Sequence, residues 1–173
     1  TEHYGASQDP PEKSVPVCTL KNFPHLIEHT LQWARDWFEG AYKQAMDDSN
    51  SYLTGAEGAF AASLESSQST KLETVVRVFE TLVRQRPESY ADCVSWARLA
   101  FQDMFCNKIK QLLHSFPADH LTTEGTPFWS GAKKPPVALE FDANDAAHIE
   151  FVVSAACLRA KCYGLPVPAD ASN

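Results

Sequence analysis

The sequence predicts an all-α domain, a single irregular array of about five or more helices with an extended N-terminal strap and a long loop containing proline and glycine. Apolar residues recur at helical spacing over several long segments, and no convincing strand pattern appears. Prolines and glycines gather between these segments, where they end helices. We expect a strap over residues 1–24, a helical domain over residues 25–165 and a C-terminal tail over residues 166–173.

The composition predicts one folded domain without a membrane or nucleic-acid partner. Hydrophobic residues make up 44% of the 173 residues and aromatic residues 11%, enough for a buried core. The formal net charge is -7 without a Lys/Arg run, whereas nucleic-acid binding depends on clustered cations. No stretch approaches the roughly 20 apolar residues that span a bilayer, and the start lacks the apolar segment of a signal peptide. We expect a soluble monomer. Because the sequence begins with Thr1 and not with an initiator methionine, we also expect a fragment of a longer protein.

The first helix is predicted to follow the strap directly. Pro10, Pro11 and Pro16 fix φ and lack amide donors, so the strap cannot sustain a helix. A helix should begin after Phe23-Pro24, because proline is preorganised for a first helical turn. Two apolar stripes follow, so we expect this helix to be packed on more than one side as the scaffold of the domain. The stripes are Ile27, Leu31, Ala34, Phe38 and Ala41, and Leu26, Thr30, Trp33 and Trp37.

The middle of the chain has one weak and one clear pattern. Residues 47–68 are rich in Ser, Gly, Ala and Asp, which predicts a loop with one short helix around residues 58–64. Thr70 followed by Glu73 has the pattern of a capping box. The amphipathic helix that this box opens should end before Pro87. Its apolar positions are Leu72, Val75, Val76, Phe79, Leu82 and Val83.

Two further helices flank a long loop. Ser89 is predicted to cap the longest helix, which Phe116-Pro117 ends. Periodicity then disappears from Ala118 to Asn144, and a loop of this length in a compact domain usually has a function. We therefore treat it as a candidate binding surface. Asp145 is predicted to cap a last helix, which ends at Gly164.

Four of the five cysteines are expected to be structural. The odd number and the absence of a CxxC pair argue against a disulfide framework or a zinc ribbon and fit a reducing compartment such as cytosol or nucleus. Cys93 and Cys157 lie on apolar helical stripes, where a thiol behaves as a small hydrophobe. Cys106 and Cys162 lie in helices without a local activating feature.

Cys18 differs because it lies outside any predicted helix, just before a helix start. Thr19 and the cation Lys21 follow it. A nearby ammonium group, a helix N-terminus or oriented backbone N–H groups enrich the thiolate of a thiol that otherwise titrates near roughly 8.5. This setting allows exposure and activation, but spacing alone leaves the role of Cys18 undecided.

Two other chemistries have partial support. His25, Glu28 and His29 match the H-x-x-E-H pattern of one group of zinc peptidases. Two points argue against a zinc site: both histidines are expected on the exposed side or rim of their helix, and no downstream acidic residue stands out as a third ligand. A cysteine protease would pair Cys18 with a distant His, but six histidines always permit such a pairing, which makes this signal weak.

A longer pattern resembles the catalytic-cysteine segment of ubiquitin-activating enzymes. It consists of Cys18-Thr19-Leu20-Lys21-Asn22-Phe23-Pro24 followed by residues 27–36, IEHTLQWARD. The resemblance continues through residues 91–97, 111–117, 127–131 and 139–142, and is weakest over residues 47–68. In that family this region is the second catalytic cysteine half-domain, an all-helical insertion. The H-x-x-E-H match then looks coincidental, since His25 need not be histidine in the family.

The resemblance implies a thioester-forming role for Cys18. Its thiolate would attack the ubiquitin acyl-adenylate, and ubiquitin would then pass to the cysteine of a conjugating enzyme. Supporting roles fall to Thr19, Lys21 and Asp142. The Asp142 carboxylate would help to deprotonate the incoming thiol during transfer, although Asp142 is equally well explained as a cap of the loop before a helix. No cofactor is expected in this segment, because ATP and Mg would be bound by adenylation domains elsewhere in the longer enzyme.

The implied partners are ubiquitin, a conjugating enzyme and the remaining domains of the same enzyme, and the implied location is cytoplasm and nucleus. One alternative from a different class remains open. The chain could be a helical interaction module whose loop, Ala118 to Asn144, binds ubiquitin or a conjugating enzyme without chemistry.

Overall fold

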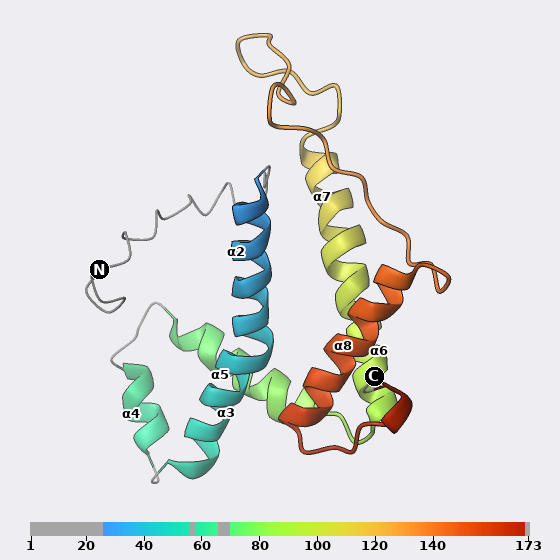
Figure 1. Cartoon of the computed structure of the whole chain (residues 1–173). Coiled ribbons are helices and arrows are strands. Elements are labelled where there is room, and N and C mark those ends of the chain that lie inside the picture. Colours follow the sequence, from blue (N-terminus) through green and yellow to red (C-terminus); the bar gives the residue numbers. More distant parts are fainter. Residues whose placement is uncertain (1–25, 56–57, 66–69, 172–173) are drawn as a thin grey trace, which may run out of the picture.

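The computed structural model describes residues 26–55, 58–65 and 70–171 (Figure 1). Within these ranges every regular element is helical, and the only β interaction is an isolated bridge between Leu121 and Pro127. The prediction of an all-α fold is therefore confirmed. None of the described helices is long and apolar enough to cross a membrane.

The first described helix is longer than predicted. It comprises α2 (Ile27–Phe38), the π-helical segment η2 (Glu39–Gln44) and α3 (Ala45–Thr54), which follow one another without a break. The prediction that residue 47 begins a loop is wrong, because α3 continues to Thr54. Side-chain pairs that composition does not reveal stabilise α3: the Lys43 ammonium binds the Asp47 carboxylate, and Arg77 of α5 binds Asp48. The predicted short helix is confirmed as α4 (Ala59–Glu65).

The next helix begins where predicted but without its predicted cap. It comprises α5 (Lys71–Phe79) and η3 (Glu80–Arg84), and thus ends before Pro87. Thr70 holds the N-cap position with φ of -111° and ψ of 0°, yet its side chain makes no capping hydrogen bond. The capping-box prediction is therefore wrong here, since a capping side chain works from an extended N-cap backbone.

The caps of the two remaining long helices are confirmed. Ser89 opens α6 (Tyr90–Phe101) with a reciprocal capping box to Asp92, and the helix continues through η4 (Gln102–Asn107) into α7 (Lys108–Ser115). Asp145 caps α8 (Ala146–Cys162) by accepting hydrogen bonds from two backbone N–H groups of its first turn. Gly164 ends α8 with a φ of +66°, and the short 3-10 helix η5 (Ala169–Ala171) follows.

The core lies between α6 and α8, which Figure 1 shows side by side. Small side chains dominate it and let the two helices approach closely. Larger residues, including Trp96, Phe141 and Phe151, pack around this seam. Its buried members are Cys93, Ala97, Val152, Ala155, Ala156 and Ala160.

Two predicted apolar stripes are not buried. In α2, Ile27 is 74% exposed and Leu31 64%, whereas Trp33 and Trp37 of the second stripe pack against aromatic rings of the domain. In α5, Leu72 is 75% exposed. Helical spacing indicates that a face is apolar but not which neighbour covers it, and the described elements leave these faces open.

Candidate functional site

Three of the predicted site residues lie in the described part of the chain: Glu28 and His29 of the zinc hypothesis, both in α2, and Asp142. Cys18, Thr19, Lys21 and His25 fall outside it, so their roles stay predictions. Asp142 lies within it, in the turn that joins the long loop to α8.

The Asp142 carboxylate is exposed and held in a turn. Its Oδ1 accepts hydrogen bonds from the backbone N–H of Asn144 at 2.8 Å and from the Asn144 side-chain amide at 3.0 Å. These bonds, first the backbone one and then the side-chain one, lower the pKa of Asp142 below its ordinary value. The group is therefore ionised at neutral pH. It can accept a hydrogen bond or stabilise positive charge, but its low pKa makes it a poor proton acceptor.

The backbone of Asp142 is anchored to α8 by His148. The Asp142 N–H donates a hydrogen bond to His148 Nδ1 at 3.1 Å, and the Asp142 carbonyl accepts one from the Asp145 N–H at 3.2 Å. The imidazole ring lies against Phe101 of α6, with centroids 4.7 Å apart, and stacks on Phe141 at 5.9 Å. Sequence reasoning missed His148. Its position three residues beyond the N-cap Asp145 was the available signal, because side chains of a first turn face the incoming loop.

A cation completes this anchor. The Arg98 guanidinium carbon lies 4.3 Å from the centroid of the Phe141 ring and 5.9 Å from that of Phe101. Such cation–π contacts stabilise by roughly 0.5–1 kcal/mol at exposed sites. The residue just before Asp142 is thus fixed by three side chains of α6 and α8.

The four described thiols are buried or half-buried. Cys93 and Cys106 are buried, and burial raises the pKa of the Cys93 and Cys162 thiols. Cys157 is half-buried, and its thiol is bonded to the carbonyl of Ala171 at 3.3 Å. Their predicted structural role is consistent with these positions.

The long loop has its own ordered core at the end of α7. The rings of Phe116 and Phe128 stack 4.5 Å apart, and His120 lies edge-on to both. The indole N–H of Trp129 donates to the carbonyls of Phe116 and Pro117 at 3.1 and 2.9 Å. The loop is thus a preformed surface rather than a tether.

One argument against the zinc hypothesis is wrong. His29 is only 6% exposed, so the prediction that it lies on the exposed side or rim of its helix is wrong. Glu28 is exposed, and no three His, Cys, Asp or Glu side chains among the described residues cluster as metal ligands.

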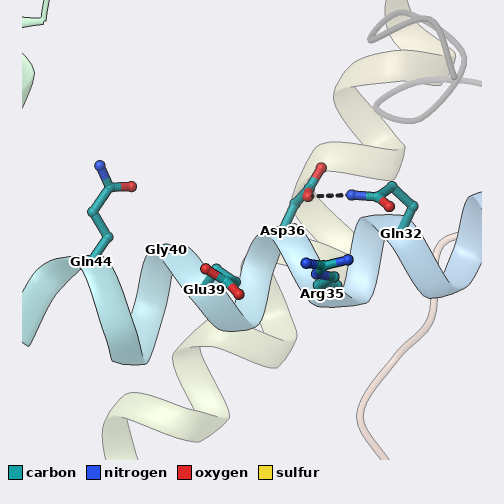
Figure 2. A pocket seen from close by; sticks show the side chains of 6 residues that line it. All are labelled: Gln32, Arg35, Asp36, Glu39, Gly40 and Gln44. Atoms are coloured by element: carbon teal, nitrogen blue, oxygen red, sulfur yellow. Dashed lines mark hydrogen bonds between the residues drawn. The ribbon is translucent and has the colours of Figure 1, made fainter. Parts of the chain in front are cut away.

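Two depressions border α2. Figure 2 shows a polar one whose lining side chains all belong to the continuous helix α2–η2, where Gln32 donates a hydrogen bond to Asp36 at 2.7 Å. Its lining residues are Gln32, Arg35, Asp36, Glu39, Gly40 and Gln44. The second is an apolar groove between α2–η2 and α8, lined among others by Trp33, Trp37, Phe105, Phe151 and Leu158. Neither gathers groups that suggest chemistry.

The described residues define the class of this protein as an all-helical domain whose four described thiols are buried or half-buried. The family model described as the SCCH domain of ubiquitin-activating enzyme matches residues 24–173. The chain therefore belongs to this family of ubiquitin-activating enzyme domains.

Individual relatives agree with this assignment. The chain is 52% identical over 165 residues to Ubiquitin-like modifier-activating enzyme 1 of Mus musculus and 51% identical over 166 residues to the enzyme of that name in Dictyostelium discoideum. It is 49% identical over 170 residues to a ubiquitin-activating enzyme of Schizosaccharomyces pombe. These alignments cover 95%, 95% and 98% of this chain but only 16%, 16% and 17% of the relatives. The alignments therefore include the Cys18 segment, because each omits fewer than ten residues of the chain.

Proposed function

We propose that this chain is the ubiquitin-accepting cysteine domain of a ubiquitin-activating enzyme and that Cys18 is its nucleophile. The observation that carries the proposal is the 52% identity to the mouse enzyme across a segment that includes Cys18. The thiol inventory supports it, because the described cysteines are buried or half-buried. ATP and Mg would be bound by the remaining domains, and cytoplasm and nucleus remain the predicted location.

Two acyl transfers follow from this role. In the first, the Cys18 thiolate attacks the carbonyl carbon of the ubiquitin acyl-adenylate, the bond to the phosphate oxygen breaks, and AMP leaves. In the second, the thiolate of a conjugating enzyme attacks the thioester carbon, and the bond to Cys18 breaks. The Cys18 thiolate departs, and solvent accepts the proton of the incoming thiol. An acyl phosphate is already activated, so the first step needs mainly a positioned thiolate and donors for the developing oxyanion.

The supporting residues have distinct proposed roles. Lys21 favours the Cys18 thiolate through its positive charge, and Thr19 donates a hydrogen bond to the developing oxyanion. Asp142 orients the incoming thiol by accepting a hydrogen bond from its S–H group before solvent takes the proton. Its lowered pKa argues against a role as general base, since a free thiol titrates near roughly 8.5 and proton transfer to this carboxylate is strongly uphill.

A chimera tests the proposal. This chain would replace the matching segment of the mouse relative, and the product would be incubated with ATP, Mg and ubiquitin. We expect an adduct that thiol reductants remove, that Cys18→Ala abolishes and that Cys18→Ser converts into a reductant-resistant ester. Cys157→Ala is the matched control, because it removes a half-buried thiol of α8 and should leave the adduct unchanged. An adduct that survives Cys18→Ala contradicts the proposal.

The ordered loop favours a second candidate function, which is binding without chemistry. The aromatic cluster around Phe116 and Phe128 holds a rigid surface on which Leu121 is 57% exposed. If this were the whole function, profiling with a thiol-reactive probe would label Cys18 no faster than an ordinary exposed thiol. Selective labelling of Cys18 in the chimera would favour the thioester role instead.

A further inference from the structure

We propose that His148 is a positioning residue that holds the Asp142 carboxylate in place for the transfer of ubiquitin from Cys18 to the incoming thiol. This inference rests on the proposed function of Asp142. It adds a residue that neither composition nor the resemblance singled out, and it follows from the hydrogen bond between the Asp142 N–H and His148 Nδ1.

Asp142 is held by its own turn and by the helices. Its carboxylate bonds only to Asn144, two residues further along the same exposed turn, among the contacts of the described residues. This bond shapes the turn but does not tie it to the helices. The link to the helices runs through the backbone at two points, where the Asp142 N–H donates to His148 Nδ1 at 3.1 Å and the Asp142 carbonyl accepts from the Asp145 N–H at 3.2 Å. Of these two bonds, only the first is made by a side chain, so a substitution of His148 loosens the turn that carries the carboxylate.

The His148 side chain is fixed by aromatic packing. Its ring is half-buried against Phe101 and stacked on Phe141, which fixes the ring plane and directs Nδ1 toward the turn. Because Nδ1 accepts a hydrogen bond, the proton of the neutral ring is on Nε2. Nδ1 is thus an acceptor supplied by a helix and held in one orientation by two aromatic rings.

In catalysis, the anchor at His148 would keep the Asp142 carboxylate in one position. A carboxylate that orients a reacting group is effective only when it is held within a fraction of an ångström, and such precision comes from supporting residues on rigid elements. His148 lies in the first turn of α8, and Phe101 lies in α6, the two helices that form the core. The turn is thereby attached to the two helices that form the core.

The test separates this hydrogen bond from simple packing. In the chimera, transfer from loaded Cys18 to a ubiquitin-conjugating enzyme would be followed in single turnover at saturating acceptor. His148→Phe keeps an aromatic ring but loses the acceptor, whereas His148→Asn loses the ring but places an amide oxygen near the position of Nδ1. We expect His148→Phe to slow transfer roughly 3- to 10-fold and His148→Asn to retain at least about half of the parental rate. Loading of Cys18 and the KM for the acceptor should change by less than about twofold in both variants.

A variant that combines His148→Phe with Asp142→Asn distinguishes a role through Asp142 from a role in packing alone. If His148 acts through Asp142, adding His148→Phe to Asp142→Asn should slow transfer by less than about twofold beyond Asp142→Asn alone. Multiplying losses, or equal losses in the Phe and Asn variants, would overturn the inference and indicate packing. Should His148→Phe fail to fold, His148→Gln replaces it, because its longer amide reaches the position of Nε2 instead of Nδ1.

The outcomes also distinguish this inference from the proposed function. A parental chimera without a Cys18 adduct contradicts the proposed function itself. A loaded chimera in which Asp142→Asn transfers at the parental rate removes the role of the carboxylate and overturns the inference, while the thioester role of Cys18 stands.

Discussion

Arg159 Nη2 donates a hydrogen bond to the carbonyl of Gln85 at 2.6 Å, which ties α8 to the end of the helix α5–η3. The guanidinium carbon also lies 4.1 Å from the centroid of the Trp96 ring, and the Trp96 indole donates to the Gln85 side chain. Arg159 is only 5% exposed, and burial lowers its pKa. Its Nε is the one buried side-chain nitrogen or oxygen without a partner among the described residues. A buried cation held by a carbonyl and a ring thus joins three helices.

Truncation of this cation should destabilise the domain. Arg159→Ala removes the cation–π contact and leaves the Gln85 carbonyl without this donor, so we expect a loss of about 3 kcal/mol in the free energy of unfolding. Arg159→Met keeps much of the packing and removes the cost of burying a charge, which predicts a loss of about 1 kcal/mol. Urea unfolding measures both. Equal losses would show that the charge itself is what stabilises this site.

The close approach of α6 and α8 predicts a steric penalty. Ala156 is 0% exposed in the seam between these helices. Ala156→Leu should lower the free energy of unfolding by about 1–3 kcal/mol through overpacking, whereas Lys161→Leu on the exposed side of α8 should change it by less than about 0.5 kcal/mol. Thermal unfolding of the two variants provides the comparison. A seam that accepts leucine without loss would contradict the close packing.

The capping box of α6 predicts a local stability effect. Ser89 Oγ accepts a hydrogen bond from the Asp92 N–H, and the Asp92 carboxylate accepts one from the Ser89 N–H at 2.9 Å. Ser89→Ala should lower the free energy of unfolding by about 1 kcal/mol. Ser95→Ala is the matched control, because this exposed hydroxyl bonds back to Ala91 within the same helix and should be close to neutral. Similar losses in both would argue against the cap.

The same box predicts a dependence on pH. Hydrogen bonds from the Ser89 side chain and from the backbone N–H groups of Glu88 and Ser89 lower the pKa of Asp92 below its ordinary 3.8. A carboxyl whose folded pKa is depressed stabilises the fold above its unfolded pKa and loses that contribution as pH falls through the folded value. The advantage of the parent over Asp92→Asn should therefore be full near pH 6 and shrink below about pH 3.8. Urea unfolding across this range tests the direction, and a constant difference would contradict it.

Order in the long loop should depend on one indole. Trp129 donates to the carbonyls of Phe116 and Pro117, which fastens residues 120–129 to the end of α7. Trp129→Phe keeps an aromatic ring and removes the donor. We expect faster amide hydrogen exchange at Phe128 and Thr122, whose N–H groups bond within the loop, and unchanged exchange in α8. Unchanged exchange in the loop would show that ring packing alone orders it.

Local signals predicted several of the helix ends and two of the caps. Pro87 and Pro117 act through their own φ and missing donor, and Ser89 and Asp145 bond within their own first turns. Such effects involve neighbours in sequence, so residue order reveals them. The same holds for Gly164, whose positive φ ends α8.

Long-range packing was not predictable in this way. The segments η2, η3 and η4 interrupt helical spacing with π turns, and no residue type marks them in advance. Helical spacing likewise could not show that His29 would be buried while Ile27 stayed exposed, because that depends on which side of α2 meets the domain. For the candidate site, the residues alone left Cys18 undecided, and the family resemblance indicated Cys18 and Asp142, but the anchoring of Asp142 by His148 required the fold.

The central claim is that Cys18 carries ubiquitin. The most direct test is mass spectrometry of the loaded chimera after tryptic digestion at mildly acidic pH, where trypsin still cleaves and the thioester persists, because cleavage after Lys13 and Lys21 isolates Cys18 in the peptide of residues 14–21. The account predicts that the thioester-linked acyl remnant maps to this peptide and disappears after treatment with hydroxylamine. A remnant on a peptide that carries Cys93, Cys106, Cys157 or Cys162, with residues 14–21 unmodified, would contradict it.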